Sequence, residues 1–317
     1  MNRLSRILRP GSSRKHVDCG VQSFRIHWPL LLLVVSAPSF GQLSPIRARI
    51  DSIAGQAKGM VGVAAIDLGS GDTLSLRGDG HFPMQSVFKF PLALAVLNQV
   101  DRGVLALKRP VHIAGADLHP ATWSPLRQAY PAGDIDLPLD SLLAYTVVWS
   151  DNNACDILFR LLGGTAVVDR YVHRLGIRDI AIVANEDEMH QAWEVQYRNW
   201  SSPRAMAALL RLFANGGILS RESREYLWQL MASRSSGSKR IRGLLPPGAV
   251  VPHKTGSSGT NEKGIAAATN DIGILVLPGG RRIALVVFVS ESAASDDQRD
   301  MVIASIARAV WDYCSAH

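Results

Sequence analysis

Short apolar runs bounded by turn residues occur near both ends of the chain, and this pattern predicts β-strands. The expected strands cover 61–68, 73–77, 250–255, 265–277 and 282–290. Glycine-containing turns at 69–72 and 278–280 join neighbouring strands, as expected for hairpins. The two ends of the chain therefore both contribute strands.

The rest of the chain favours helices, because its apolar residues recur on one side of a helical turn. The expected helices cover 44–58, 86–100, 139–148, 152–162 and 203–215, and a last one opens at 295–297 and continues through 310. Ser202 and Pro203 form a start signal, and Gly163 and Gly216 are stop signals. Pro91 is expected to remove a hydrogen bond from its helix or to kink it.

This order of elements predicts a mixed α/β protein in which strands from both termini form one domain. An all-helical domain would be inserted between them. The expected boundaries are 42–80 together with 235–317 for the α/β domain, and 81–234 for the mainly helical domain. The cleft between the two domains is the expected place for an active site.

The N-terminus has the composition of a secretory leader. Residues 1–27 carry six basic side chains and one acidic side chain, 28–37 are apolar, and small residues surround Gly41. The apolar part is too short to cross a bilayer. We therefore expect residues 1–41 to be a cleaved signal peptide and the mature protein to be periplasmic or secreted. The alternative is a buried N-terminal strand.

The positive charge of the chain resides mostly in this leader. The formal net charge is +7, and removal of 1–41 leaves 28 basic and 26 acidic residues, a net charge near +2. Nothing in this balance indicates binding to nucleic acid, and no association with a membrane is expected after cleavage.

Cysteine and histidine do not form a recognisable ligand pattern. Cys155 and Cys314 remain after the leader with its Cys19 is removed. Cys155 is expected to be a small buried side chain, and a bridge to Cys314 is the alternative. The nine histidines are scattered without metal-site spacing, so no metal and no cofactor are predicted.

Ser86 and Lys89 are the first pair that suggests chemistry. Three residues apart on an expected helix, they share one face. An amine near a hydroxyl can help to remove its proton, which turns serine into a nucleophile. Many helices contain this spacing by chance, so further evidence has to come from the rest of the chain.

That evidence is the order of three later elements, at 150–152 (Ser-Asp-Asn), around Glu186, and at 254–256 (Lys-Thr-Gly). With Ser86-Val87-Phe88-Lys89 they resemble the motifs of class A serine β-lactamases, three of which are shared with penicillin-binding proteins. The separations, 64 residues from Ser86 to Ser150 and 104 from Ser150 to Lys254, fit that family.

The resemblance covers essentially the whole chain after the leader. Segments 150–156, 184–186 and 195–200 are most similar to the extended-spectrum branch that includes the PER-type enzymes. The implied fold is that of β-lactamases and transpeptidases, an antiparallel sheet flanked by helices with an inserted helical domain. The implied partners are small-molecule β-lactams, and the expected oligomeric state is a monomer.

The resemblance also implies catalytic roles. Ser86 would attack the β-lactam carbonyl, with Lys89 beside it, and Ser150 would pass a proton to the departing ring nitrogen. The backbone N–H groups of Ser86 and Ser257 would form an oxyanion hole. The alternative for Ser150, taken without the other motifs, is a helix cap, and Asp151 is expected to stabilise its own loop.

Further residues would bind the substrate. Asn152 would bind its acylamido side chain. The substrate carboxylate would meet Lys254, Thr255 and Ser257, with Arg240 a weaker candidate whose alternative is a solvated surface charge. Trp123 resembles an aromatic gate at the cleft mouth, and its alternative is a buried core residue.

Glu186 distinguishes a hydrolase from a protein that stays acylated, because hydrolysis of the ester needs a general base. It follows Ser150 by 36 residues, as expected for that base, and Glu188 is the competing candidate. Lys89 and Glu186 both remain candidates for the acylation base.

The chain departs from the usual class A pattern around this base. Asp187 replaces a proline, His190 stands where an asparagine that holds water is expected, and Asp156 replaces an asparagine that ties the loop. We infer a rearranged loop and a wider cleft, which would admit bulky oxyimino-cephalosporins. The competing functions are a D,D-peptidase and a β-lactam sensor domain.

Overall fold

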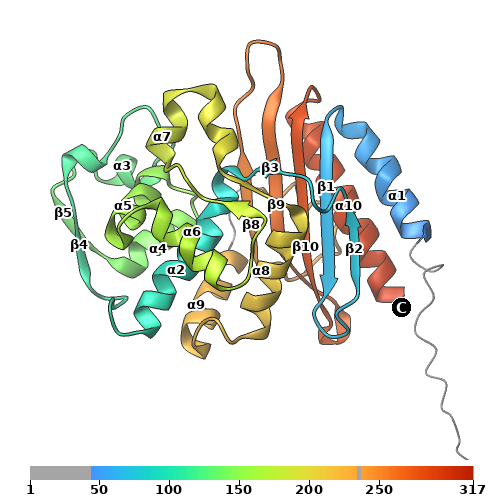
Figure 1. Cartoon of the computed structure of the whole chain (residues 1–317), viewed down its shortest axis with the longest axis horizontal. Coiled ribbons are helices and arrows are strands. Elements are labelled where there is room, and N and C mark those ends of the chain that lie inside the picture. The colour runs from blue at the N-terminus through green and yellow to red at the C-terminus, as the bar shows by residue number, and fades with distance from the viewer. Residues whose placement is uncertain (1–43, 234–236, 317) are drawn as a thin grey trace, which may run out of the picture. The chain divides into compact units, whose positions relative to one another are not determined.

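Five antiparallel strands form the central sheet of the computed structural model, which describes residues 44–233 and 237–316 (Figure 1). Their order is β2–β1–β10–β9–β8. The strands are β1 (Met60–Asp67), β2 (Thr73–Leu76), β8 (His253–Ser257), β9 (Ala266–Val276) and β10 (Arg282–Ser292). These are the strands predicted at the two ends of the chain, with boundaries moved by a few residues. The 69–72 and 278–280 turns connect them as expected.

Alternate residues of each central strand face opposite layers of the core. In β1, Val61 and Val63 pack with one hydrophobic cluster, whereas Ala64 and Ile66 pack with the other. The same alternation continues on β10, where Val287 and Phe288 belong to different clusters. A strand buried on both sides needs apolar residues at successive positions, which explains the continuous apolar runs in the sequence.

Helices cover both faces of this sheet. Figure 1 shows α1 and α10 side by side on one face, and both contribute to the same hydrophobic cluster. Helix α8 packs against β1, β9 and β10 on the other face. The bounds are α1 (Ser44–Ala54), followed by the 3₁₀ helix η2 (Gly55–Ala57), α8 (Pro203–Asn215) and α10 (Asp296–Ala316).

The middle of the chain supplies the remaining helices. They are α2 (Lys89–Asp101), α3 (Pro125–Ala129), α4 (Leu139–Val147), α5 (Asn152–Leu162), α6 (Thr165–Arg174), α7 (Glu186–Gln191) and α9 (Arg221–Ala232). The 3₁₀ helices of this segment are η3 (Gln85–Phe88), η4 (Gly115–Asp117) and η5 (Trp193–Arg198), whereas η6 (Pro278–Gly280) forms the turn between β9 and β10. The expectation that this segment is all-helical is wrong in detail, since short strands lie within it.

Those short strands form two small sheets. One pairs β4 (Pro110–Ile113) with β5 (Ile135–Pro138), and the other has the order β3–β7–β6. The latter strands are β3 (Phe82–Pro83), β6 (Ile180–Ala181) and β7 (Trp200–Ser201). Strands of two to four residues are too short to give a periodic signal. The domain boundaries at 80 and 234 stay a prediction.

The local helix signals operate as expected, with one exception. The Ser202 side chain accepts a hydrogen bond from the Ala205 N–H at the start of α8, and Gly163 ends α5 with a φ of 92°. Pro91 is the exception. The segment expected as one helix begins as η3, and the α-helix starts only at Lys89, so Pro91 lies in its first turn. An N–H in the first turn has no partner within the helix, so proline is tolerated there.

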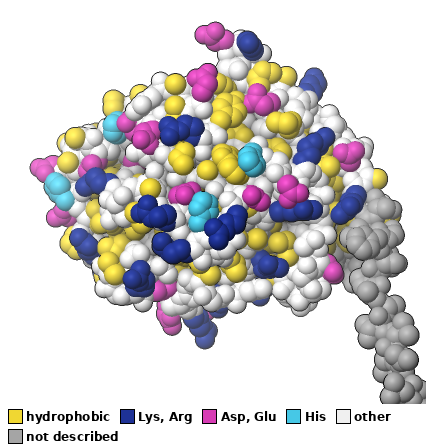
Figure 2. Space-filling model, in the orientation of Figure 1, with side chains coloured by type: hydrophobic (Ala, Val, Ile, Leu, Met, Phe, Trp, Pro, Cys, Tyr) yellow, Lys and Arg dark blue, Asp and Glu magenta, His cyan; other side chains and the backbone are white. Residues whose placement is uncertain are grey.

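The predicted leader, residues 1–41, lies outside the described residues, as does Cys19, and its cleavage stays a prediction. No helix in the described ranges is long and apolar enough to span a bilayer. On the face drawn in Figure 2, basic and acidic side chains are interspersed. This mixture agrees with the near-neutral charge calculated for 42–317.

Candidate active site

Ser86 and Lys89 lie at the junction of η3 and α2, on one face as predicted. The Lys89 ammonium nitrogen is 3.0 Å from the Ser86 hydroxyl oxygen. Ser86 is half-buried, whereas Lys89 is completely buried. A serine hydroxyl that can reach solvent beside a buried amine has the arrangement required of an activated nucleophile.

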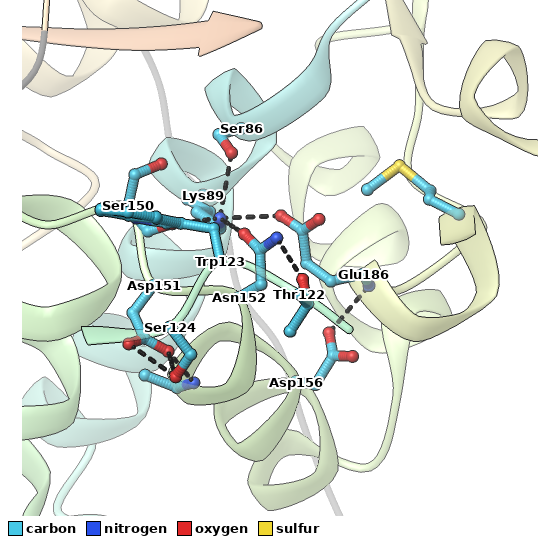
Figure 3. Close-up of polar contacts among 12 residues, drawn as sticks. Ser86, Lys89, Thr122, Trp123, Ser124, Ser150, Asp151, Asn152, Asp156 and Glu186 are labelled. Carbon is cyan, nitrogen blue, oxygen red and sulfur yellow. Dashed lines mark hydrogen bonds and ion pairs between the residues drawn. The ribbon is translucent and has the colours of Figure 1, made fainter. Parts of the chain in front are cut away.

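Lys89 is the centre of the site (Figure 3). Besides Ser86, its ammonium nitrogen contacts the Ser150 carbonyl at 2.9 Å, Asn152 Oδ1 at 2.5 Å and Glu186 Oε1 at 2.7 Å. The Glu186 carboxylate compensates the buried charge. Four oxygen atoms surround a nitrogen that carries at most three hydrogens. Therefore either two of the oxygen atoms share one ammonium hydrogen, or one of the oxygen atoms carries a proton itself and donates it to the nitrogen.

Glu186 lies at the start of α7, and its side chain points inward from the loop. Only 5% of the residue is exposed. Glu188 is different, because its carboxylate accepts the Asn185 N–H in a capping box at the start of the same helix. Of the two acidic residues weighed from the sequence, Glu186 is therefore the one that contacts Lys89.

Asp156, on α5, binds the backbone of the loop that carries Glu186. Its two carboxylate oxygens accept the backbone N–H groups of Glu186 at 2.8 Å and of Asp187 at 2.9 Å. Burial is the main cause that raises the Asp156 pKa to about 7; the nearby Glu186 charge acts in the same direction, whereas the two N–H donors and Lys89 oppose the rise. An aspartate thus makes the contact with the loop backbone that is expected of an asparagine in the usual pattern.

Ser150 occupies the turn between α4 and α5 with a φ of 57°, in the left-handed region that non-glycine residues rarely adopt. Its hydroxyl oxygen accepts a hydrogen bond from the Lys254 ammonium at 2.9 Å. The helix-capping alternative for Ser150 is wrong, because Asp151 caps α5 by accepting the Ala154 N–H.

Asp151 stabilises its own loop, as expected. Its buried carboxylate accepts the Leu126 N–H at 2.6 Å and the Ser124 hydroxyl at 2.9 Å, in addition to the α5 cap. Burial is the main influence on the Asp151 pKa and raises it, while the hydrogen bonds lower it. The residue therefore fixes the segments that carry Trp123 and Ser150.

Lys254 projects from β8 toward Ser150. It is 2% exposed, and burial lowers its pKa to about 7, with the Lys89 charge as the next cause. The two lysines thus approach the catalytic region from different elements, Lys89 from α2 and Lys254 from the edge of the sheet.

The backbone of β8 at Ser257 faces outward from the sheet. The Pro252 carbonyl accepts the Ile274 N–H at 3.0 Å, and the Ser258 N–H donates to the Ala268 carbonyl at 2.9 Å. Hydrogen bonding alternates along an antiparallel pair, so Ser257 directs its N–H away from β9. Because β8 is the edge strand, that N–H points to the outer side of the sheet.

Gly256 allows β8 to approach η3 closely. A Cβ atom on Gly256 would lie 2.5 Å from the Met84 carbonyl oxygen and 3.0 Å from the Val87 nitrogen. Ser86 lies between these two positions, so the missing side chain brings the nucleophile and the strand edge together.

Arg240 braces the same strand edge. Its guanidinium donates to the Ser257 hydroxyl at 2.7 Å and to the Gly256 carbonyl at 3.1 Å, and it pairs with Asp300 at 2.7 Å. Its side chain is 11% exposed, so the alternative of a solvated surface charge is wrong. Thr255 is buried beside Lys254, whereas Ser257 is exposed.

Trp123 is 58% exposed, which excludes the alternative of a core residue. Its indole N–H donates to the Trp149 carbonyl at 3.0 Å, next to Ser150 in the chain (Figure 3). Its neighbour Thr122 was not identified from the sequence, although its hydroxyl accepts the Asn152 amide at 2.7 Å. No motif marks Thr122.

Cys155 and Cys314 lie in different parts of the fold, on α5 and α10. Cys155 is buried and Cys314 is partly buried, and both are free thiols, so the bridge alternative is wrong. Within 44–233 and 237–316, no cluster of three or more His, Cys, Asp or Glu side chains could hold a metal ion.

A model of the beta-lactamase enzyme family matches residues 45–314. The chain belongs to this family. Relatives within it include beta-lactamase VEB-1 of Pseudomonas aeruginosa, 42% identical over 277 residues, which are 87% of this chain and 92% of the relative. Extended-spectrum beta-lactamase PER-1 of the same organism is 42% identical over 285 residues, 89% of this chain and 92% of the relative.

A solved β-lactamase from Chitinophaga pinensis has the same fold. It is 52% identical, with a TM-score of 0.84, and the match covers 85% of this chain and 99% of the other. The β-lactamase fold and the similarity to class A enzymes of the PER-like branch, both expected from the motifs, are confirmed. The chain is an enzyme of the hydrolase class.

Proposed function

We propose that this β-lactamase opens the β-lactam amide by forming an acyl-enzyme on Ser86 and then hydrolyses that ester. The observation that carries the proposal is the Lys89 ammonium, which lies 3.0 Å from the Ser86 hydroxyl and 2.7 Å from the Glu186 carboxylate. One buried cation thus joins the nucleophile to a base suited to activating water.

In the acylation step, the Ser86 oxygen attacks the carbonyl carbon of the ring. The developing oxyanion would accept hydrogen bonds from the backbone N–H groups of Ser86 and Ser257, donors worth on the order of 3 kcal/mol each. The outward direction of the Ser257 N–H and the close approach at Gly256 support this assignment.

Two proton movements accompany this attack. The Ser86 proton goes either to Glu186 or to Lys89, which can accept it only after giving one of its own protons to Glu186; both residues belong to one hydrogen-bonded group and stay candidates. The ring nitrogen receives a proton from the Ser150 hydroxyl as the amide bond breaks. Ser150 accepts a hydrogen bond from Lys254, which can replace the proton.

Deacylation requires water. Once the proton gained by Lys89 or Glu186 in acylation has been returned through solvent to Lys254, the Glu186 carboxylate would take a proton from a water molecule while the resulting hydroxide attacks the ester carbonyl. That proton would go to the Ser86 oxygen as the ester bond breaks. The buried position of Glu186 beside Lys89, whose ammonium also contacts Ser86, supports this role.

The substrate would be held by polar groups at the sheet edge and on α5. Its carboxylate would contact Lys254, Thr255 and Ser257. Arg240 would lie beside it, because its guanidinium donates a hydrogen bond to the Ser257 hydroxyl. Asn152 would bind the acylamido side chain, and the exposed Trp123 would lie along it at the cleft mouth. We expect oxyimino-cephalosporins among the substrates, because the chain is similar to a relative named an extended-spectrum enzyme.

We also infer that the protein acts outside the cytoplasm as a monomer. The leader pattern of 1–41 supports export, since a basic head precedes a short apolar stretch. Mass spectrometry of exported protein beginning near residue 42 and a monomeric mass in sizing experiments are the expected results.

Nitrocefin hydrolysis by wild type, Glu186→Gln and Glu188→Gln tests the proposed reaction. Wild type and Glu188→Gln should turn over, because Glu188 caps α7 at the surface. Glu186→Gln should accumulate a covalent adduct on Ser86, detected by intact-protein mass, because the ester forms but lacks its hydrolytic base.

The other outcomes identify competing functions. A wild-type protein that forms a stable stoichiometric adduct would be a D,D-peptidase or a sensor. Unchanged turnover in Glu186→Gln would remove Glu186 from the mechanism. Hydrolysis of benzylpenicillin without hydrolysis of cefotaxime or ceftazidime would refute the extended substrate range.

A further inference from the structure

The orientation of Asn152 follows from its neighbour Lys89. An ammonium group only donates hydrogen bonds, so the Asn152 atom at 2.5 Å must be the carbonyl oxygen. The amide nitrogen then points the other way and donates to the Thr122 hydroxyl oxygen at 2.7 Å (Figure 3). This leaves the Thr122 hydroxyl hydrogen available for a further acceptor.

That acceptor is His190. Its Nδ1 atom is 2.6 Å from the Glu186 backbone carbonyl, which only accepts, so Nδ1 carries the hydrogen. In the neutral ring Nε2 is then an acceptor, and the Thr122 hydroxyl lies 3.4 Å from it. The bonds run in one direction, from Lys89 through Asn152, Thr122 and His190 back to the backbone of Glu186.

His190 therefore has a different role from the asparagine expected at its position, which would hold a water molecule. Both ring nitrogens contact protein groups, one on the loop backbone and one on Thr122. We propose that Thr122 and His190 are positioning residues, which hold the Glu186 loop in register with Asn152 and Lys89 for deacylation. This inference rests on the proposed role of Glu186.

The space around the link explains why side chains are needed there. A cavity of about 70 Å³ lies between the 119–122 segment and the 186–190 segment, so side chains must bridge the two. His119 and Asp187 make a second bridge across it at 3.2 Å, and Asp156 and Asn153 complete its wall. Thr122 is the bridging residue that also reaches Asn152.

A double-mutant cycle tests the link. Thr122→Val removes the hydroxyl, His190→Ala removes the ring, and the double variant removes both. Acylation and deacylation rates with nitrocefin are measured separately by stopped flow, with His112→Ala on β4 as a matched histidine control. Circular dichroism melting confirms that each variant is folded.

If the two residues act as one unit, each single variant lowers the deacylation rate about tenfold and the double variant lowers it no further. Acylation should change less than deacylation, and Thr122→Ser should restore the rate. A hundredfold loss in the double variant, an equal loss in acylation, or no loss would overturn the inference. If wild type stayed acylated, the proposed function would fail instead.

Discussion

Replacement of Gly256 by alanine should separate the nucleophile from the strand edge that completes the site. The new Cβ would lie 2.5 Å from the Met84 carbonyl oxygen, whereas ordinary contacts begin at 3.4 Å. The η3 segment that carries Ser86 would have to move away from β8 by about 1 Å, since backbone atoms cannot rotate aside. Gly256 lies in an extended strand without a positive φ, so the clash itself is the perturbation.

The magnitude follows from this displacement. A misplacement of about 1 Å between reacting groups can lower a rate on the order of 100-fold. Overpacking of this kind should also cost roughly 1–3 kcal/mol of unfolding free energy. The oxyanion hole should suffer most, because one proposed donor is on Ser86 and the other on Ser257.

Nitrocefin kinetics and thermal unfolding of Gly256→Ala would measure both effects. Gly259→Ala is the matched control, since among the described residues no atom lies within 4 Å of its added Cβ. We expect the kcat/KM of Gly256→Ala to fall about 100-fold while Gly259→Ala keeps wild-type values. Wild-type kcat/KM in a folded Gly256→Ala protein would refute the reasoning from close approach.

Two further predictions concern buried charges. Asp151→Ala should lose about 2–4 kcal/mol of unfolding free energy in urea, because the Leu126 and Ala154 N–H groups lose their buried acceptor; a loss below about 0.5 kcal/mol would contradict this. Burial lowers the Lys254 pKa to about 7, so its positive charge is lost as pH rises through 7 and KM for carboxylate-bearing substrates should rise. Lys254→Arg keeps its charge and should flatten that profile; parallel profiles for the two proteins would argue against titration of Lys254.

The sequence determined the elements that depend on neighbouring residues. The strands at both ends, the cap at Ser202 and the shared face of Ser86 and Lys89 follow from periodicity and local hydrogen bonding. The short strands β3 to β7 were not predicted, because their pairing depends on contacts distant in the chain. The prediction that Pro91 would weaken its helix was wrong for a related reason. The segment begins as the 3₁₀ helix η3, so α2 starts only at Lys89 and Pro91 falls in its first turn, where proline is tolerated.

The order of the motifs also identified the candidate catalytic groups, but it does not determine which of their side chains contact one another. Only the tertiary structure brings Lys254 to Ser150 across 104 residues, because that contact requires the packing of β8 against the helices. Similarly, the choice between Glu186 and Glu188 depends on which carboxylate the loop turns toward Lys89. Local patterns establish which residues are present on each element, whereas the direction of each side chain is set by packing between elements.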